Sequence, residues 1–328
     1  MTIHYSVFMG AILAALASEI FISPAIAGPY VAGDRTFPAT PTTNYPFVAD
    51  AAYGSVTSMR EGAPDTGIRQ TALGFGVEKR ITEDLGIEVE DAYNILNMPA
   101  RKNAYGFGNV EATAKYQLFL SDEHEFLLSA GVQREFGGSG ANRVGAEAVS
   151  ATTPTLFFGK GLGDLAESVK YLRPIAITGT VGYQRADQRT RTIATIDPQS
   201  GVSQLSIEHN PDQLVLGFAL EYSLRYLEGN VAYLGLPGFI GRLTPVVEFA
   251  YTVPVGTAFG APTTGIIAPG FIYSANGIDL GVEALIPATR QSGTNVGVIA
   301  SVHIPFETFL PAAAGKPLFG GEHREGRP

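Results

Sequence analysis

The stretch Asn109–Phe136, NVEATAKYQLFLSDEHEFLLSAGVQREF, decides the fold because it holds the clearest two-residue alternation in the chain. A polar turn, Ser121–Glu125, divides it into two arms. The apolar side consists of Val110, Ala112, Ala114, Tyr116 and Leu118 in the first arm and Phe126, Leu128, Ala130 and Val132 in the second. The polar side consists of Glu111, Thr113, Lys115 and Gln117, then Ser129, Gly131, Gln133 and Glu135. This period of two predicts a β-hairpin with one apolar and one polar face.

The length of the two arms points to a membrane. Each arm has about ten residues, which is the length that a tilted strand needs to cross the hydrocarbon layer of a bilayer. Ionic groups keep to one face, except Arg134 near the end of the second arm. This pattern favours a strand of a transmembrane barrel with lipid on its apolar face. A soluble β-sandwich shows the same alternation, so the hairpin alone leaves both classes open.

The composition of the 328 residues favours the membrane class. Charged residues make up 16% of the chain, against about 25% in ordinary soluble proteins. The 39 glycines and 14 tyrosines suit tightly paired strands with aromatic residues at the membrane interfaces. The chain has no cysteine, which excludes disulfides and thiolate metal sites.

The amino terminus predicts a cleaved signal peptide over residues 1–27. Tyr5–Ser18 is an uncharged, largely apolar run that is too short for a spanning helix, and Ala25 and Ala27 fit a cleavage site before Gly28. Removal of this segment leaves 22 basic and 30 acidic residues and a net charge of −8. Nucleic acid is therefore not an expected partner.

Twelve segments with strand character follow. They are residues 51–59, 69–78, 86–95, 110–118, 126–135, 152–160, 173–184, 213–223, 243–253, 266–273, 278–286 and 296–306. Connections near 82, 123, 167, 233 and 276 are short or helical, whereas those near 63, 102, 144, 197, 260 and 290 are longer and rich in Gly, Pro or polar residues.

This parity predicts an all-β fold, a single antiparallel transmembrane β-barrel of about twelve strands over residues 51–306. Short turns and both ends of the mature chain are expected to face the periplasm. Residues 28–50, which are aperiodic and rich in Pro, Thr and Gly, are interpreted as a periplasmic leader or plug-like segment. Residues 307–328 are interpreted as a periplasmic tail.

Several segments between about residues 66 and 320 resemble a group of Gram-negative outer-membrane barrels akin to the meta-pathway phenol-degradation barrels. These segments are TPTLFFGKGLGDL, LRPIAITG, FALEYSLRYL, RLTPVVEFA, GVEALIPATRQSGTNVGVIASVHI and GKPLFG. The resemblance implies an outer-membrane location, a transport function and a small, apolar or aromatic substrate. It carries over no catalytic or ligand residue. Barrels commonly end on an aromatic residue, whereas 22 residues follow Phe306 here, so recognition by the barrel-assembly machinery is expected around Ile304–Phe309.

The ionic side chains are expected to line the lumen, because lipid surrounds the outer face. The candidates are Glu78, Glu88, Glu90, Glu111, Lys115, Glu135, Lys160, Glu221, Glu248, Asp279, Glu283 and His303. Acids outnumber bases in this set. Two interpretations stay open: a wet passage or pocket that favours cations, and a packed interior of ion pairs that keeps the barrel closed.

The sequence contains no local signature of an enzyme. It has no Gly-x-Ser-x-Gly elbow, phosphate loop or zinc spacing, and no cofactor or metal is expected. A lone inward histidine such as His303 is more often a hydrogen-bonded interior residue than a catalytic base. We therefore expect a passive channel or transporter, with a closed structural or partner-binding barrel as the alternative and an outer-membrane enzyme as the third hypothesis. Outer-membrane lipid and a small-molecule substrate are the other expected partners.

Overall fold

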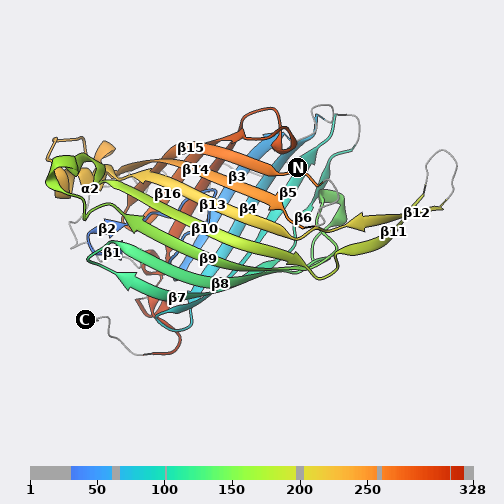
Figure 1. The fold of residues 1–328 in the computed structure, drawn as a ribbon, viewed down its shortest axis with the longest axis horizontal. Coiled ribbons are helices and arrows are strands. Elements are labelled where there is room, and N and C mark those ends of the chain that lie inside the picture. The colour runs from blue at the N-terminus through green and yellow to red at the C-terminus, as the bar shows by residue number, and fades with distance from the viewer. Residues whose placement is uncertain are drawn as a thin grey trace, which may run out of the picture.

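A closed antiparallel β-barrel makes up most of the molecule (Figure 1). The structure is a computed structural model that describes residues 31–60, 67–99, 102–196, 203–256, 261–310 and 312–320. The barrel strands are β3 (Ala51–Arg60), β4 (Arg69–Arg80), β5 (Leu85–Asn97), β7 (Glu111–Ser121), β8 (Phe126–Glu135), β9 (Ala151–Gly161), β10 (Ile175–Ala186), β13 (Gln213–Tyr222), β14 (Leu243–Pro254), β15 (Thr264–Ala275), β16 (Ile278–Pro287) and β17 (Gly297–Pro305).

The barrel closes because its first and last strands, β3 and β17, pair from Ala51↔Pro305 to Ser58↔Val298. Each remaining barrel strand pairs with the barrel strands that precede and follow it in the chain. A short strand, β6 (Ala104–Phe107), pairs with the end of β5, while β7 pairs with the beginning of β5. The thirteen strands of this sheet therefore act as twelve, since β6 and β7 share one place. The predicted fold class is confirmed.

The hairpin of β7 and β8 shows how the alternation places side chains. Thr113, Lys115 and Ser129 point inward and are buried. Tyr116 and Leu118 are 48% and 52% exposed on the outside. The same parity leaves an outer band of exposed apolar side chains on the other strands, including Val56, Leu73, Phe75, Val89, Leu156, Val181, Leu220, Phe271, Val282 and Val298. An apolar outer band around a closed barrel is the arrangement that meets acyl chains.

The two ends of the barrel differ in their connections. One end, the short-turn rim, carries residues 81–84, 122–125, 162–174, 223–242 and 276–277. Asn276 and Gly277 have φ angles of 53° and 78°, as the predicted primed turn requires. The other end, the long-loop rim, carries the remaining connections, as predicted from their lengths. α2 (Leu224–Tyr226) lies at the short-turn rim, and a hairpin of β11 (Thr190–Ile196) and β12 (Ser203–His209) projects from the long-loop rim (Figure 1).

Two connections that were expected to be loops contain strands. TRTIATI and SQLSIEH pair as β11 and β12, because the first is rich in the β-branched residues Thr and Ile and the second alternates apolar with polar residues, as Leu205 and Ile207 show. AYGF forms β6 because the end of β5 extends beyond β7 and offers it a free edge. Both additions lie at the long-loop rim and leave the barrel strands as predicted.

The chain on either side of the barrel returns to the short-turn rim. β1 (Val31–Ala32) and β2 (Arg35–Thr36) form a small hairpin there, ahead of β3. After β17, the tail pairs with the end of β4, where Leu318 and Phe319 donate backbone hydrogen bonds to Arg80 and Ile81. The expected signal peptide and its cleavage site lie outside the described residues. None of the helices in the described part of the chain has the length and apolar character that a membrane crossing needs.

The outer band predicts a specific cost for a charge. Leu156, in the middle of β9, is half exposed on the outer face. Leu156→Arg should lower the free energy of unfolding from lipid vesicles by about 2 to 4 kcal/mol, because an arginine at the bilayer midplane must leave water. The control is Val169→Arg, since Val169 is also exposed and apolar but lies in the connection between β9 and β10. Denaturant unfolding in vesicles measures both, and equal losses in the two variants would contradict the assigned lipid face.

Candidate functional site

The lumen of the barrel is occupied by residues 31–50, which we call the plug. Arg35 lies at the short-turn rim, where its guanidinium contacts Glu125, the backbone of Pro174 and the ring of Tyr226. Thr43 lies near the middle of the barrel, because a Cβ added at Gly217 of β13 would sit 3.3 Å from the Thr43 Cβ. Asp50 is back at the short-turn rim beside Lys79 and Arg80. The plug therefore enters and leaves through the same end.

The apex of the plug is bound by carboxylates of the wall. The backbone N–H groups of Thr42 and Thr43 donate to the two carboxylate oxygens of Glu248 at 3.0 and 2.6 Å. The hydroxyl of Thr43 donates to Glu248 at 2.5 Å, and that of Thr42 donates to Glu283 at 2.6 Å. The backbone N–H of Ala39 donates to Asp279 at 2.9 Å. Inward acids thus satisfy backbone donors that have no strand partner.

The opposite wall supplies donors to the carbonyls of the plug. Lys115 Nζ donates to the carbonyl oxygen of Tyr45 and to Asn44 Oδ1, both at 2.9 Å. Ser129 Oγ donates to the carbonyl oxygen of Pro46 at 2.6 Å. The two walls therefore complement the plug backbone. Acceptors on β14 and β16 face its N–H groups, and donors on β7 and β8 face its carbonyls.

A second polar cluster joins the plug to β3, β4, β5 and β17. The hydroxyl of Tyr45 contacts the carboxylate of Glu78 and lies 2.9 Å from His303 Nε2. The ring of Tyr53 stacks on His303 with 6.4 Å between centroids. Tyr53 Oη lies 2.6 Å from Glu88 and 2.7 Å from Glu90. These contacts place the predicted His303 in a hydrogen-bonded interior cluster.

Ion pairs fix both ends of the plug at the short-turn rim. Arg35 Nε lies 3.1 Å from Glu125, and both side chains are buried. Asp50 is fully buried and accepts from Lys79 Nζ at 2.7 Å and from Arg80 Nε at 2.6 Å. The same two cations donate to carbonyls of the tail, Lys79 to Ala314 and Lys316, and Arg80 to Gly315. The tail is therefore connected to the plug through β4.

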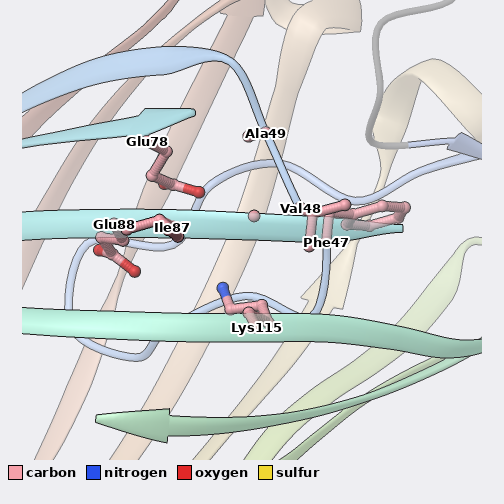
Figure 2. A pocket seen from close by; sticks show the side chains of 8 residues that line it. Phe47, Val48, Ala49, Glu78, Ile87, Glu88 and Lys115 are labelled. Atoms are coloured by element: carbon pink, nitrogen blue, oxygen red, sulfur yellow. The ribbon is translucent and has the colours of Figure 1, made fainter. Parts of the chain in front are cut away.

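Little room remains between the plug and the wall around Glu78, Glu88 and Lys115. A cavity of about 10 Å³ lies among Phe47, Val48, Ala49, Glu78, Glu88 and Lys115, which is space for about one water molecule. Figure 2 shows Glu78, Glu88 and Lys115 around this space beside the plug residues Phe47–Ala49.

Above the plug, towards the long-loop rim, the inner wall has two faces. Glu90, Glu111 and Glu135 stand opposite one another on β5, β7 and β8 and are half-buried. Met59, Ile266, Ala268, Leu285 and Ile299 form an apolar cluster on the inner side of β3 and β15–β17. The upper lumen is thus acidic on one side and apolar on the other.

All the predicted lumen residues except Lys160 lie on the inward register. Glu221 is buried and accepts from Thr178 at 3.3 Å. Glu135 accepts from Asn109 at 2.7 Å, and Glu111 accepts from Gln133. The prediction for Lys160 is wrong. It shares the outward register of Leu156 and Phe158, and its ammonium binds Asp164 and the carbonyl of His124 at the short-turn rim.

The interpretation of a packed interior of ion pairs expected the wall acids to bind basic side chains, but the acids have other partners. Glu248, Glu283 and Asp279 bind N–H and hydroxyl groups of the plug, whereas Lys115 binds plug carbonyls. The interior is packed, but the plug lies between the acids on one wall and Lys115 on the other.

Sequence reasoning missed the plug residues that make these contacts, together with Glu125, which was read as part of a polar turn. One signal for buried polar contacts of this segment was present in the sequence. Residues 28–50 contain three charged residues, Asp34, Arg35 and Asp50. The last two are fully buried.

The comparisons with known proteins bear on the fold. No protein-family model matches this chain, and no curated protein matches it in sequence. Among solved structures, the KdgM porin has a TM-score of 0.43 at 10% identity and covers 78% of this chain and 99% of its own. The COG4313 outer membrane channel from Pseudomonas putida F1 has a TM-score of 0.48 at 11% identity, with 78% and 95% covered. The toluene transporter TbuX from Ralstonia pickettii has a TM-score of 0.37 at 11% identity, with 78% of each chain covered.

These neighbours are outer-membrane barrel proteins. At such identities and scores the likeness concerns barrel architecture alone. The predicted resemblance to phenol-degradation barrels finds no support among these matches and stays a prediction.

The contacts of Glu248 predict how the plug can be loosened. Glu248→Gln replaces one acceptor oxygen with an NH₂ group that faces the N–H groups of the plug. Each charge-assisted hydrogen bond that is lost contributes about 1.5 to 3 kcal/mol, so the opened population should rise roughly tenfold or more. Ala39→Cys supplies the reporter, because Ala39 is buried and the chain has no cysteine. Maleimide labelling of the thiol introduced at position 39 should accelerate by that factor.

The matched control for this labelling experiment is Glu307→Gln, at an exposed acid outside the barrel. It should leave the labelling rate unchanged. Equal rates in the Glu248→Gln variant and its parent would show that these hydrogen bonds do not hold the plug.

Proposed function

We propose that this protein is an outer-membrane channel for a small molecule and that its own plug closes it at rest. The apolar outer band supports the membrane location, and the difference between the rims supports an orientation with the short-turn rim in the periplasm. Both ends of the plug, and the tail, then lie at the periplasmic rim.

The observation that carries the proposal is the way in which the plug is held. Its polar contacts with the wall are hydrogen bonds and ion pairs to isolated side chains, and its β1–β2 hairpin is separate from the barrel sheet. Its buried rings Phe37 and Phe47 belong to an apolar cluster that includes Leu127 and Ala176 of the wall. Water can replace the polar bonds once the plug moves, since even a hydrogen bond to a charged group contributes only about 1.5 to 3 kcal/mol net. A segment held in this way can leave the lumen without breaking the pairing of the barrel strands.

The inner wall suggests which solutes would pass. Removal of the plug would expose the carboxylates of Glu248, Glu283, Asp279, Glu78 and Glu88 together with one ammonium, Lys115. Such a wall attracts cations within about a Debye length, roughly 10 Å at 0.1 M salt. The apolar cluster around Leu285 and Ile299 adds a surface for an apolar group. We propose a small solute with an apolar part, neutral or positively charged.

The second candidate function is a permanently closed barrel with a structural or partner-binding role. The full burial of Glu248, Asp50 and Arg35 favours it, because displacement of the plug exposes or strands these charges. The enzyme hypothesis stays a prediction, which hydrolysis assays on lipid substrates test directly.

Deletion of residues 31–48 separates the channel from the closed barrel. We expect the deletion variant to conduct steadily in planar bilayers, whereas the intact protein stays closed for most of the recording. Its reversal potential in a salt gradient should show cation selectivity. Addition of Glu248→Gln and Glu283→Gln to the deletion should lower this selectivity, and Glu307→Gln should not. A folded deletion variant without conductance would exclude the channel and leave the closed barrel.

A further inference from the structure

Two arginines stand side by side on the outer face of the long-loop rim. Arg60 ends β3 and Arg69 begins β4, and the two are directly opposite in register. Both belong to the outward parity, with Val56 on β3 and Leu73 on β4. Like charges directly opposite in a sheet repel each other. No carboxylate among the described residues forms an ion pair with either arginine.

The two arginines line a recess of about 300 Å³ with Asn97, Asn103 and Pro99. Asn97 ends β5 and stands opposite Arg69, so the row Arg60, Arg69 and Asn97 crosses three neighbouring strands. Asn103 Oδ1 accepts from the backbone N–H of Met98 at 3.2 Å, which fixes one wall. The recess therefore presents the two guanidinium groups together with the side-chain amides of Asn97 and Asn103.

An exposed aromatic surface lies directly below this recess on the same strands. Phe107 of β6 stands opposite Tyr93 of β5, and their ring centroids are 5.1 Å apart. Phe75 of β4 meets Phe107 edge to face at 6.3 Å. Phe75 and Phe107 are about half exposed on the outer face, as is the neighbouring Tyr105. Along β4, Thr71 is the only outward position between Arg69 and the apolar Leu73.

We propose that Arg60 and Arg69 bind a phosphate group on the headgroup of an outer-leaflet glycolipid whose acyl chains lie on the aromatic surface. Guanidinium groups bind phosphate oxygens bidentately, and two of them neutralise its charge. A phosphate between the arginines also removes their mutual repulsion. The adjoining apolar surface favours a lipid phosphate over free phosphate. The proposal rests on the outer-membrane location given under Proposed function, but its test does not involve conductance.

The test uses the full-length protein in detergent and counts bound lipid by native mass spectrometry. The probes are diphosphorylated lipid A, the same lipid without phosphates, and inorganic phosphate. The variant Arg60→Gln/Arg69→Gln should bind diphosphorylated lipid A at least about tenfold more weakly than the parent, the loss expected for one charge-assisted hydrogen bond. The dephosphorylated lipid should bind the parent no better than it binds the variant. Inorganic phosphate in equal concentration should not displace the lipid.

The control variant is Arg185→Gln/Arg189→Gln, which removes two charges from the same rim, where Arg189 already pairs with Asp212. It should retain the affinity of the parent for lipid A. A structural role of the arginines toward the loop that joins β3 and β4 would instead lower the melting temperature of Arg60→Gln/Arg69→Gln. Three results would overturn the proposal: equal lipid binding in parent and variant, equal loss in the control, or displacement by inorganic phosphate.

Discussion

The hydrogen bonds between Glu248 and the apex of the plug meet two requirements of a filled barrel at once. A barrel in lipid must turn its charged side chains inward, and an aperiodic segment inside it must find partners for its backbone groups. Each requirement alone is costly, since an unpaired buried charge costs several kcal/mol. Here they satisfy each other, because Glu248 accepts the two N–H groups and the hydroxyl at Thr42 and Thr43.

This mutual satisfaction explains the division of charge around the lumen. Acids on β14 and β16 face N–H groups of the plug, and Lys115 and Ser129 face its carbonyls. The arrangement needs no close acid–base pair across the lumen. It also concentrates the polar cost of opening in a few side chains, beside the loss of the apolar cluster around Phe37 and Phe47. The barrel strands keep their own backbone pairing.

The barrel strands could be predicted from the sequence because lipid on one side and a polar interior on the other impose a strict period of two on every strand. The Asn276–Gly277 turn was readable for a similar reason, since its two positive φ angles demand those residues. The sequence allowed a leader or a plug-like segment at residues 28–50, but the contacts of the plug could not be predicted. Its partners lie far away in the chain, since Thr43 and Glu248 are 205 positions apart and Ala39 and Asp279 are 240 positions apart. Lys160 was misplaced because Gly159 and Gly161 obscure the alternation at the end of β9.

A disulfide between the plug and the wall shows whether the plug closes the lumen. A Cβ added at Gly217 would lie 3.3 Å from the Thr43 Cβ, slightly less than the roughly 3.5 to 4.5 Å of a disulfide, so Thr43→Cys/Gly217→Cys offers a reversible staple in a chain without other cysteines. We expect the oxidised protein to show no conductance in planar bilayers, and we expect reduction to bring back openings. Each single variant should behave the same with and without oxidant. Conductance that is equal in the stapled and the reduced protein would contradict the claim that the plug closes the lumen.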